Sequence, residues 1–143
     1  MLYYISIVAF KPMNVLLKID SIMFHVSDLR KSTEFYEDVL HLKRVWTDDE
    51  RKMVGFTFPE SDSEIVIHND ANMPDPPFSF LVANVEAFCS NYKKRGYNVV
   101  QEPLDVRCGK YAVLADPDGN RLPIIDLSRF GNKPRYDLTC QSM

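Results

Sequence analysis

The feature that most constrains the fold is an internal repeat with a spacing of 56 residues. In each copy an apolar, strand-like run ends at a residue suited to capping a helix, and an amphipathic helix follows. The matching pairs are Phe24 with Phe80, Val26 with Val82, Asp28 with Asn84, Leu29 with Val85, and Tyr36 with Tyr92. A repeat of this type implies that each copy cannot bury its sheet face alone and packs against the other copy.

Each copy is expected to form a strand, a helix and three further strands. The first helix would place Leu29, Phe35, Tyr36, Val39 and Leu40 on one apolar face. The expected strands cover residues 15–26, 42–46, 53–58 and 64–68, then 78–82, 97–100, 110–115 and 121–127, with helices over 29–40 and 85–95. We therefore predict an α+β fold, in which two tandem βαβββ modules form a concave mixed-sheet cavity.

A chain of 143 residues is long enough for one ordinary domain. We expect this domain to cover residues 17–128, with modules at 17–70 and 77–128 joined by the proline-rich linker 69–77, and a C-terminal tail at 129–143. Residues 1–16 are expected to be an N-terminal extension or an edge strand. The apolar run at residues 1–10 is too short to cross a bilayer and lacks signal-peptide flanks, so no membrane partner is expected.

Composition excludes several other classes of protein. The net charge is -3 and the Lys and Arg residues are scattered, so no basic stripe is present and nucleic acid is not an expected partner. Cys89, Cys108 and Cys140 are too irregularly spaced for a disulfide framework or a paired metal site. A reducing cytoplasm is the simplest compartment for such a chain, and Cys89 is interpreted as a small core residue.

Several short motifs occur in a defined order between residues 17 and 128. They are His25-Val26-Ser27-Asp28-Leu29, Ser32, Phe35-Tyr36, Val39-Leu40, the run from Val82 to Ala87, Gly96, and Asp116-Pro117-Asp118-Gly119-Asn120. Together they resemble the vicinal oxygen chelate superfamily, which includes glyoxalase I, extradiol dioxygenases, fosfomycin-resistance transferases and bleomycin-binding proteins. The last motif also has the residues of a hairpin turn, which we take to be its role.

The resemblance implies four positions at which enzymes of the superfamily hold a divalent metal, commonly through His, Glu or Gln. In this chain they fall on Ser21, Pro77, Pro123, and either Val66 or Ile65. Proline, valine and isoleucine side chains offer no donor atom, and serine is a poor ligand without help. We therefore expect no metal and no other cofactor.

Strand alternation predicts which side chains face the cavity, because residues two apart share one face of a sheet. Ser21, Met23 and His25 share a face, and if Val66 points inward then Glu64 and His68 do so as well. The alternative is that Glu64 and His68 lie in water at the ends of the strand. The predicted ligand-binding residues are Ser21, Met23, His25, Glu64, Val66, His68 and Ser79.

Three functions remain open at this point. The first is a metal-free small-molecule-binding protein resembling the bleomycin-resistance branch, which as in many family members would be a homodimer. The alternative is a glyoxalase-type lyase or isomerase, or a dioxygenase, with a displaced metal or with acid–base chemistry by His25 and Glu64. The third is an interaction protein that makes its contacts through the apolar N-terminal segment.

Overall fold

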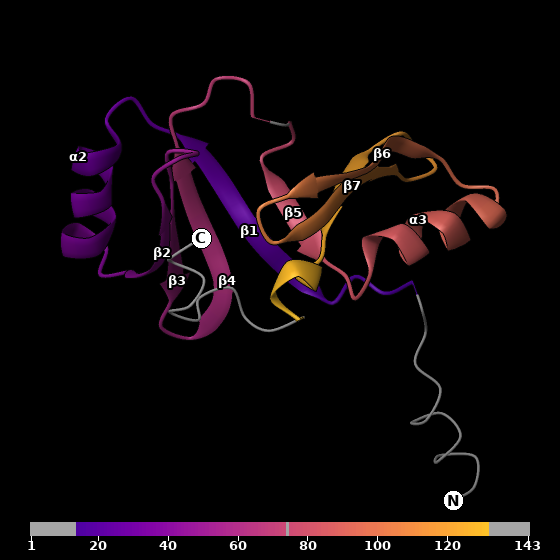
Figure 1. The fold of residues 1–143 in the computed structure, drawn as a ribbon, viewed down its shortest axis with the longest axis horizontal. Helices are drawn as coiled ribbons and strands as arrows, with labels where there is room; N and C mark the ends of the chain where they lie inside the picture. The colour runs from indigo at the N-terminus through magenta and orange to yellow at the C-terminus, as the bar shows by residue number, and fades with distance from the viewer. Residues whose placement is uncertain (1–13, 74, 132–143) are drawn as a thin grey trace, which may run out of the picture.

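The computed structural model describes residues 14–73 and 75–131 (Figure 1). Most of the expected N-terminal extension and C-terminal tail lies outside these residues. The elements are β1 (Lys18–His25), α2 (Leu29–Glu34), the π-turn η1 (Phe35–Val39), β2 (Lys43–Asp48), β3 (Met53–Phe58), β4 (Ser61–His68), β5 (Phe78–Leu81), α3 (Val85–Lys94), β6 (Val99–Val106), β7 (Gly109–Ala115), β8 (Arg121–Ile125) and the 3-10 turn η2 (Ser128–Phe130). This content confirms the predicted α+β fold.

Within the described residues the strands form one eight-stranded mixed sheet in the order β2-β3-β4-β1-β5-β8-β7-β6. At its centre β1 and β5 are antiparallel, and Ile22 lies opposite Phe78, its counterpart 56 residues later. Each central strand has a parallel neighbour, so that Phe24 pairs with Ile67 and Phe80 pairs with Ile124. The centre of the sequence repeat and the centre of the sheet therefore coincide.

Both helices lie on the same face of this sheet. α2 packs on β3 and β4, while α3 packs on β6 and β7 (Figure 1). Each helix starts at the predicted cap, since the side chain of Asp28 accepts from the backbone of Lys31 at 3.0 Å and that of Asn84 accepts from Ala87 at 2.8 Å. The opposite face of the sheet carries neither helix and is therefore free to line a cavity.

The first helix is shorter than predicted. Its regular part ends at Glu34, and the chain continues in a π-turn in which the amide of Leu40 donates to the carbonyl of Phe35 at 3.2 Å. Phe35, Val39 and Leu40 are exposed, so the expected apolar face of this helix is only partly buried. Tyr36 still packs against Phe56, with ring centroids 5.5 Å apart.

The covered face of the sheet carries the two main apolar clusters. Beneath α2 the sheet contributes Val54, Phe56 and Ile67, and the cluster between α3 and the sheet includes Phe88 of α3 and Leu114 of β7. Cys89 belongs to the second cluster, and burial raises the pKa of its thiol to about 11, which confirms its interpretation as a core residue. No helix of the described residues is long and apolar enough to cross a membrane.

Candidate functional site

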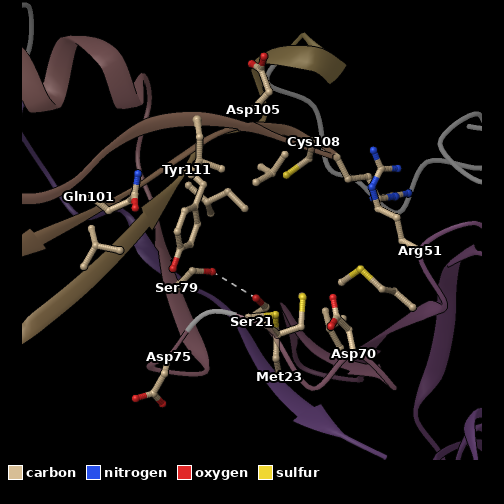
Figure 2. A pocket seen from close by; sticks show the side chains of 18 of the residues that line it. Ser21, Met23, Arg51, Asp70, Asp75, Ser79, Gln101, Asp105, Cys108 and Tyr111 are labelled. Atoms are coloured by element: carbon tan, nitrogen blue, oxygen red, sulfur yellow. Dashed lines mark hydrogen bonds between the residues drawn. The ribbon is translucent and has the colours of Figure 1, made fainter.

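A cavity of about 1060 Å³ lies on the helix-free face of the sheet. Its size is at the upper end of the range for small-molecule sites. Figure 2 shows Tyr111 and Cys108 of the second module facing Ser21 and Met23 of the first across this space. Both halves of the repeat therefore contribute to one cavity.

Four of the seven predicted ligand-binding residues line this cavity. They are Ser21 and Met23 of β1, Val66 of β4 and Ser79 of β5. The uncertainty between Val66 and Ile65 is also resolved, because Ile65 packs in the cluster beneath α2 on the other face of the sheet. Strand alternation had placed Ser21 and Met23 on one face, and Val66 with them if it points inward, as the structure shows.

Three side chains with hydroxyl groups line this cavity, and we refer to Ser21, Ser79 and Tyr111 as the hydroxyl cluster. The two serine Oγ atoms lie 3.2 Å apart in a hydrogen bond, and both residues are buried. Tyr111 is only 6% exposed, and its hydroxyl has no hydrogen-bond partner among the described residues. Burial raises the pKa of Tyr111, so its phenol is protonated at neutral pH. A buried hydroxyl without a partner costs on the order of 1–3 kcal/mol.

The side chain of Trp46 is fixed from two sides. Its indole Nε1 donates to a carboxyl oxygen of Glu64 at 2.9 Å, and the Arg107 guanidinium lies 4.1 Å from its ring centroid. Arg107 in turn lies 3.7 Å from a carboxyl oxygen of Asp48, which also accepts from Arg51 at 3.0 Å. The indole is thereby held in the cavity wall, and Trp46 is only 1% exposed.

The pKa of Asp48 shows whether its carboxyl group is ionised beside the two arginines. Burial acts to raise the pKa, but the backbone and side-chain hydrogen bonds from Arg51 and the charges of Arg51 and Arg107 outweigh it. The pKa of Asp48 is therefore held below its ordinary value, and the carboxylate stays ionised. The two arginines therefore share one carboxylate of the protein itself.

A smaller cavity of about 300 Å³ lies beside the first and shares Met23 with it. Two more of the predicted ligand-binding residues, His25 and His68, line this smaller cavity. Their ring centroids are 5.7 Å apart. The Nδ1 atom of His68 accepts from the backbone amide of Asp70 at 3.2 Å. Burial lowers the pKa of His68, and the charge of His25 lowers it further, so His68 is neutral at neutral pH.

Glu64 is placed differently from the expectation of one pocket shared by a carboxylate and two imidazoles. It lines neither cavity, is 2% exposed, and is hydrogen-bonded to Trp46. The alternative that Glu64 and His68 lie in water at strand ends is also wrong, because both are buried. The observed role of Glu64 is to orient the indole.

Trp46, Arg107 and Tyr111 line the cavity but were missing from the predicted set. Strand alternation places Tyr111 and Val113 on the same face of β7. Only the order of the strands in the sheet shows that this face lines the same cavity as β1 and β5. The contact between Trp46 and Arg107 joins two modules and has no local sequence signal. The presence of a lone tryptophan was the only available hint.

The fold and the site define a protein with a mixed sheet wrapped around a cavity of small-molecule size. The family model for the Glyoxalase/Bleomycin resistance protein/Dioxygenase superfamily matches residues 18–124. The chain belongs to this superfamily, as its sequence resemblance predicted. A search among curated proteins found no match.

Solved structures with the same fold include several superfamily members. Methylmalonyl-CoA epimerase from Mycobacterium tuberculosis is 16% identical with a TM-score of 0.58, and the match covers 80% of this chain and 91% of that one. The 2,3-dioxygenase LapB from Pseudomonas sp. KL28 is 20% identical with a TM-score of 0.56, covering 79% and 41%. A hypothetical protein from Bacillus halodurans C-125 is 19% identical with a TM-score of 0.56, covering 75% and 91%. At these identities the similarity shows the fold alone.

The four positions that hold a metal in enzymes of the superfamily do not fit one here. Val66, Pro77 and Pro123 have no donor atom in their side chains, and the hydroxyl of Ser21 is bonded to Ser79. In residues 14–73 and 75–131, no group of three or more His, Cys, Asp or Glu side chains is arranged to hold a metal ion. The donor set at the family position is therefore unsuited to a divalent cation.

Proposed function

We propose that this chain is a metal-free small-molecule-binding protein, resembling the bleomycin-resistance branch of its superfamily. The observation that carries the proposal is a cavity of about 1060 Å³ whose family metal positions are Ser21, Val66, Pro77 and Pro123. A cavity of this size offers enough surface to enclose a ligand, while these four residues offer no site for the usual catalytic cation.

The chemistry of the wall favours a partly aromatic ligand. Met23 and Met53 line the cavity and pack against the buried indole of Trp46. Thioether side chains adapt to flat aromatic groups and make favourable contacts with them. The few polar groups, chiefly the hydroxyl cluster, would set the orientation of the ligand.

Binding can be measured directly, because Trp46 is the one tryptophan of the chain and lies in the cavity wall. We expect saturable changes in its fluorescence with at least one member of a panel of aromatic and glycopeptide-type antibiotics, without conversion of the compound. Val113→Phe, which adds volume inside the cavity, should weaken binding at least tenfold. Val39→Phe, at a position 58% exposed on η1, is the matched control and should bind as the wild type does.

A negative result with the whole panel, or equal binding by Val113→Phe and the wild type, would contradict the proposal. Thermal unfolding of both variants serves as the check on folding. A loss of binding confined to Val113→Phe, with an unchanged melting temperature, places the ligand in the cavity.

A second candidate is a metal-free enzyme that moves a proton, and it is favoured by His68. This residue is 4% exposed beside the cavity, and its lowered pKa keeps the imidazole available as a base. Solvent deuterium should then be incorporated into methylmalonyl-CoA, or into the hemithioacetal of methylglyoxal and glutathione. Incorporation that His68→Gln abolishes would establish the enzyme, whereas no incorporation in either compound would exclude both reactions.

We also propose that the protein is a cytoplasmic homodimer. Ile22 and Phe24 of β1 are 42% and 45% exposed at the centre of the sheet, and Phe35 is 47% exposed on the same helix-bearing side. A patch at the centre of a repeated sheet suits a contact between two copies related by a two-fold axis. Sedimentation of Phe24→Asp should give a monomer, and a wild type that is itself monomeric would contradict this proposal.

A further inference from the structure

The hydroxyl cluster has unused hydrogen-bonding capacity. Each hydroxyl carries one donor hydrogen, and the bond between Ser21 and Ser79 uses only one of the two serine hydrogens. No other hydrogen bond of either serine side chain occurs in the part of the chain that the structure describes, and Tyr111 has none. Two O–H donors, one from the serine pair and one from Tyr111, are therefore available at one place.

The geometry directs these donors to the same part of the cavity. Ser79 on β5 and Tyr111 on β7 are separated by β8, with Tyr111 paired to Ile125 and Ile125 paired to Leu81. Figure 2 shows the phenol end of Tyr111 directed toward Ser79, with the Ser21–Ser79 bond beside it. A single acceptor atom with two lone pairs, placed between them, can satisfy both donors.

The charges around the cluster favour a neutral acceptor over an anion. Ser21 lies beside Glu64 in the register of β1 and β4, so a negatively charged ligand group would approach a buried carboxyl group. Arg51 and Arg107 share the single carboxylate of Asp48 at the other end of the cavity, and Arg121, which also lines the cavity, is exposed, so that water screens its charge. Placing an unpaired anion at the cluster would be costly, whereas a carbonyl oxygen would not be.

We infer that the hydroxyl cluster binds a carbonyl oxygen, and that the ligand is an uncharged aromatic carbonyl compound. Tyr111 and one serine donate to the oxygen, and the aromatic part lies along Met23 and Met53. This inference rests on the proposed binding function and names its ligand class. It also assigns a recognition role to Ser21, which stands at one of the four positions that the resemblance gives for a metal ligand.

Three naphthalenes of similar size test the inference. 2-Acetylnaphthalene has the carbonyl group, 2-ethylnaphthalene replaces it with a methylene group, and 2-naphthoate carries an anion. Calorimetry and Trp46 fluorescence should show that the wild-type full chain binds the ketone about tenfold or more tightly than either of the others. These compounds are unreactive toward thiols, which matters because Cys108 also lines the cavity.

Variants locate the carbonyl. Tyr111→Phe should weaken binding of the ketone about tenfold and leave binding of 2-ethylnaphthalene unchanged, and Ser79→Ala should act in the same direction. The infrared carbonyl stretch of the bound ketone, shifted to lower frequency by two donors, should move back toward its free value in Tyr111→Phe. Tyr97→Phe, on a residue 43% exposed and outside the cavity, is the control for the loss of a phenol.

Each outcome has a distinct meaning. Equal binding of the three compounds, tighter binding of the naphthoate, or a ketone preference untouched by Tyr111→Phe and Ser79→Ala overturns the inference but leaves the binding function standing. Binding of none of the three overturns the inference, and the antibiotic panel then decides the binding function separately. Tyr111→Phe should also melt no lower than the wild type, because it removes a buried hydroxyl without a partner.

Discussion

At the scale of single residues, Gly55 is required by the position of Trp46. A Cβ atom at residue 55 would collide with the indole ring of Trp46, its neighbour on β2. The strand geometry of β3 suits most residues, so here it is the space beside the backbone that excludes a side chain. The position of the buried indole of Trp46 therefore depends on a glycine in a neighbouring strand.

We predict that Gly55→Ala destabilises the fold by about 1–3 kcal/mol and displaces Trp46. Urea unfolding measures the first effect, and the wavelength of tryptophan emission measures the second. Gly119→Ala is the control, because Gly119 has a φ of 85° with no nearby atoms, so substitution strains only the hairpin turn. Equal emission spectra for Gly55→Ala and the wild type would contradict this account of the indole.

His68 gives a prediction about pH. Burial and the charge of His25 lower its pKa below 6.5, so the unfolded chain takes up a proton more readily than the folded one. The stability contributed by neutral His68 is complete above about pH 6.5 and is lost as the pH falls through the lower folded pKa. His68→Gln should flatten the decline in stability between pH 7 and pH 5, measured by urea unfolding. An unchanged slope in the variant would show that other groups cause the decline.

At the scale of elements, Asp126 joins the helix and sheet of the second module. Its carboxyl group is 1% exposed and accepts hydrogen bonds from the amides of Val85 and Lys110, each at 2.9 Å, and from Ser128. These donors belong to the start of α3, to β7 and to η2. One side chain thus fixes the end of β8 against three other elements.

Removing this carboxyl group should be among the most damaging single changes. We predict that Asp126→Ala lowers the free energy of unfolding by about 3 kcal/mol or more, because several buried donors lose their acceptor. Asp118→Ala, in the exposed turn between β7 and β8, should change it by less than about 0.5 kcal/mol. Chemical denaturation of the two variants compares them, and similar stabilities would refute the role given to Asp126.

The elements were predictable where the local signal is strong. β3 occupies the expected residues 53–58, and both helix caps are as expected. β6 was predicted to end at residue 100 but continues to Val106, since Pro103 interrupts the strand pattern and the pairing is irregular between Gln101 and Leu104. The π-turn after α2 likewise has no simple pattern in the sequence.

At the scale of the whole molecule, the repeat predicted the architecture better than the site. Ile22 and Phe78 lie opposite each other because the two modules are joined through β1 and β5. Ser21 and Ser79 could be predicted from alternation in these strands, whereas the contact of Trp46 with Arg107 requires knowledge of how the modules curve toward each other. The division into residues 17–128 and flanking segments stays a prediction.

The central claim is that the cavity binds a small molecule without a metal ion, and calorimetry on two preparations tests it. One sample of the purified protein is treated with a chelator, and the other is supplemented with Ni, Zn, Mn or Fe. Titration with 2-acetylnaphthalene should give the same one-to-one binding and the same affinity in both samples, with less than about a tenth of an equivalent of metal retained after dialysis. Binding that disappears on chelation and returns with one of these metals would contradict the account.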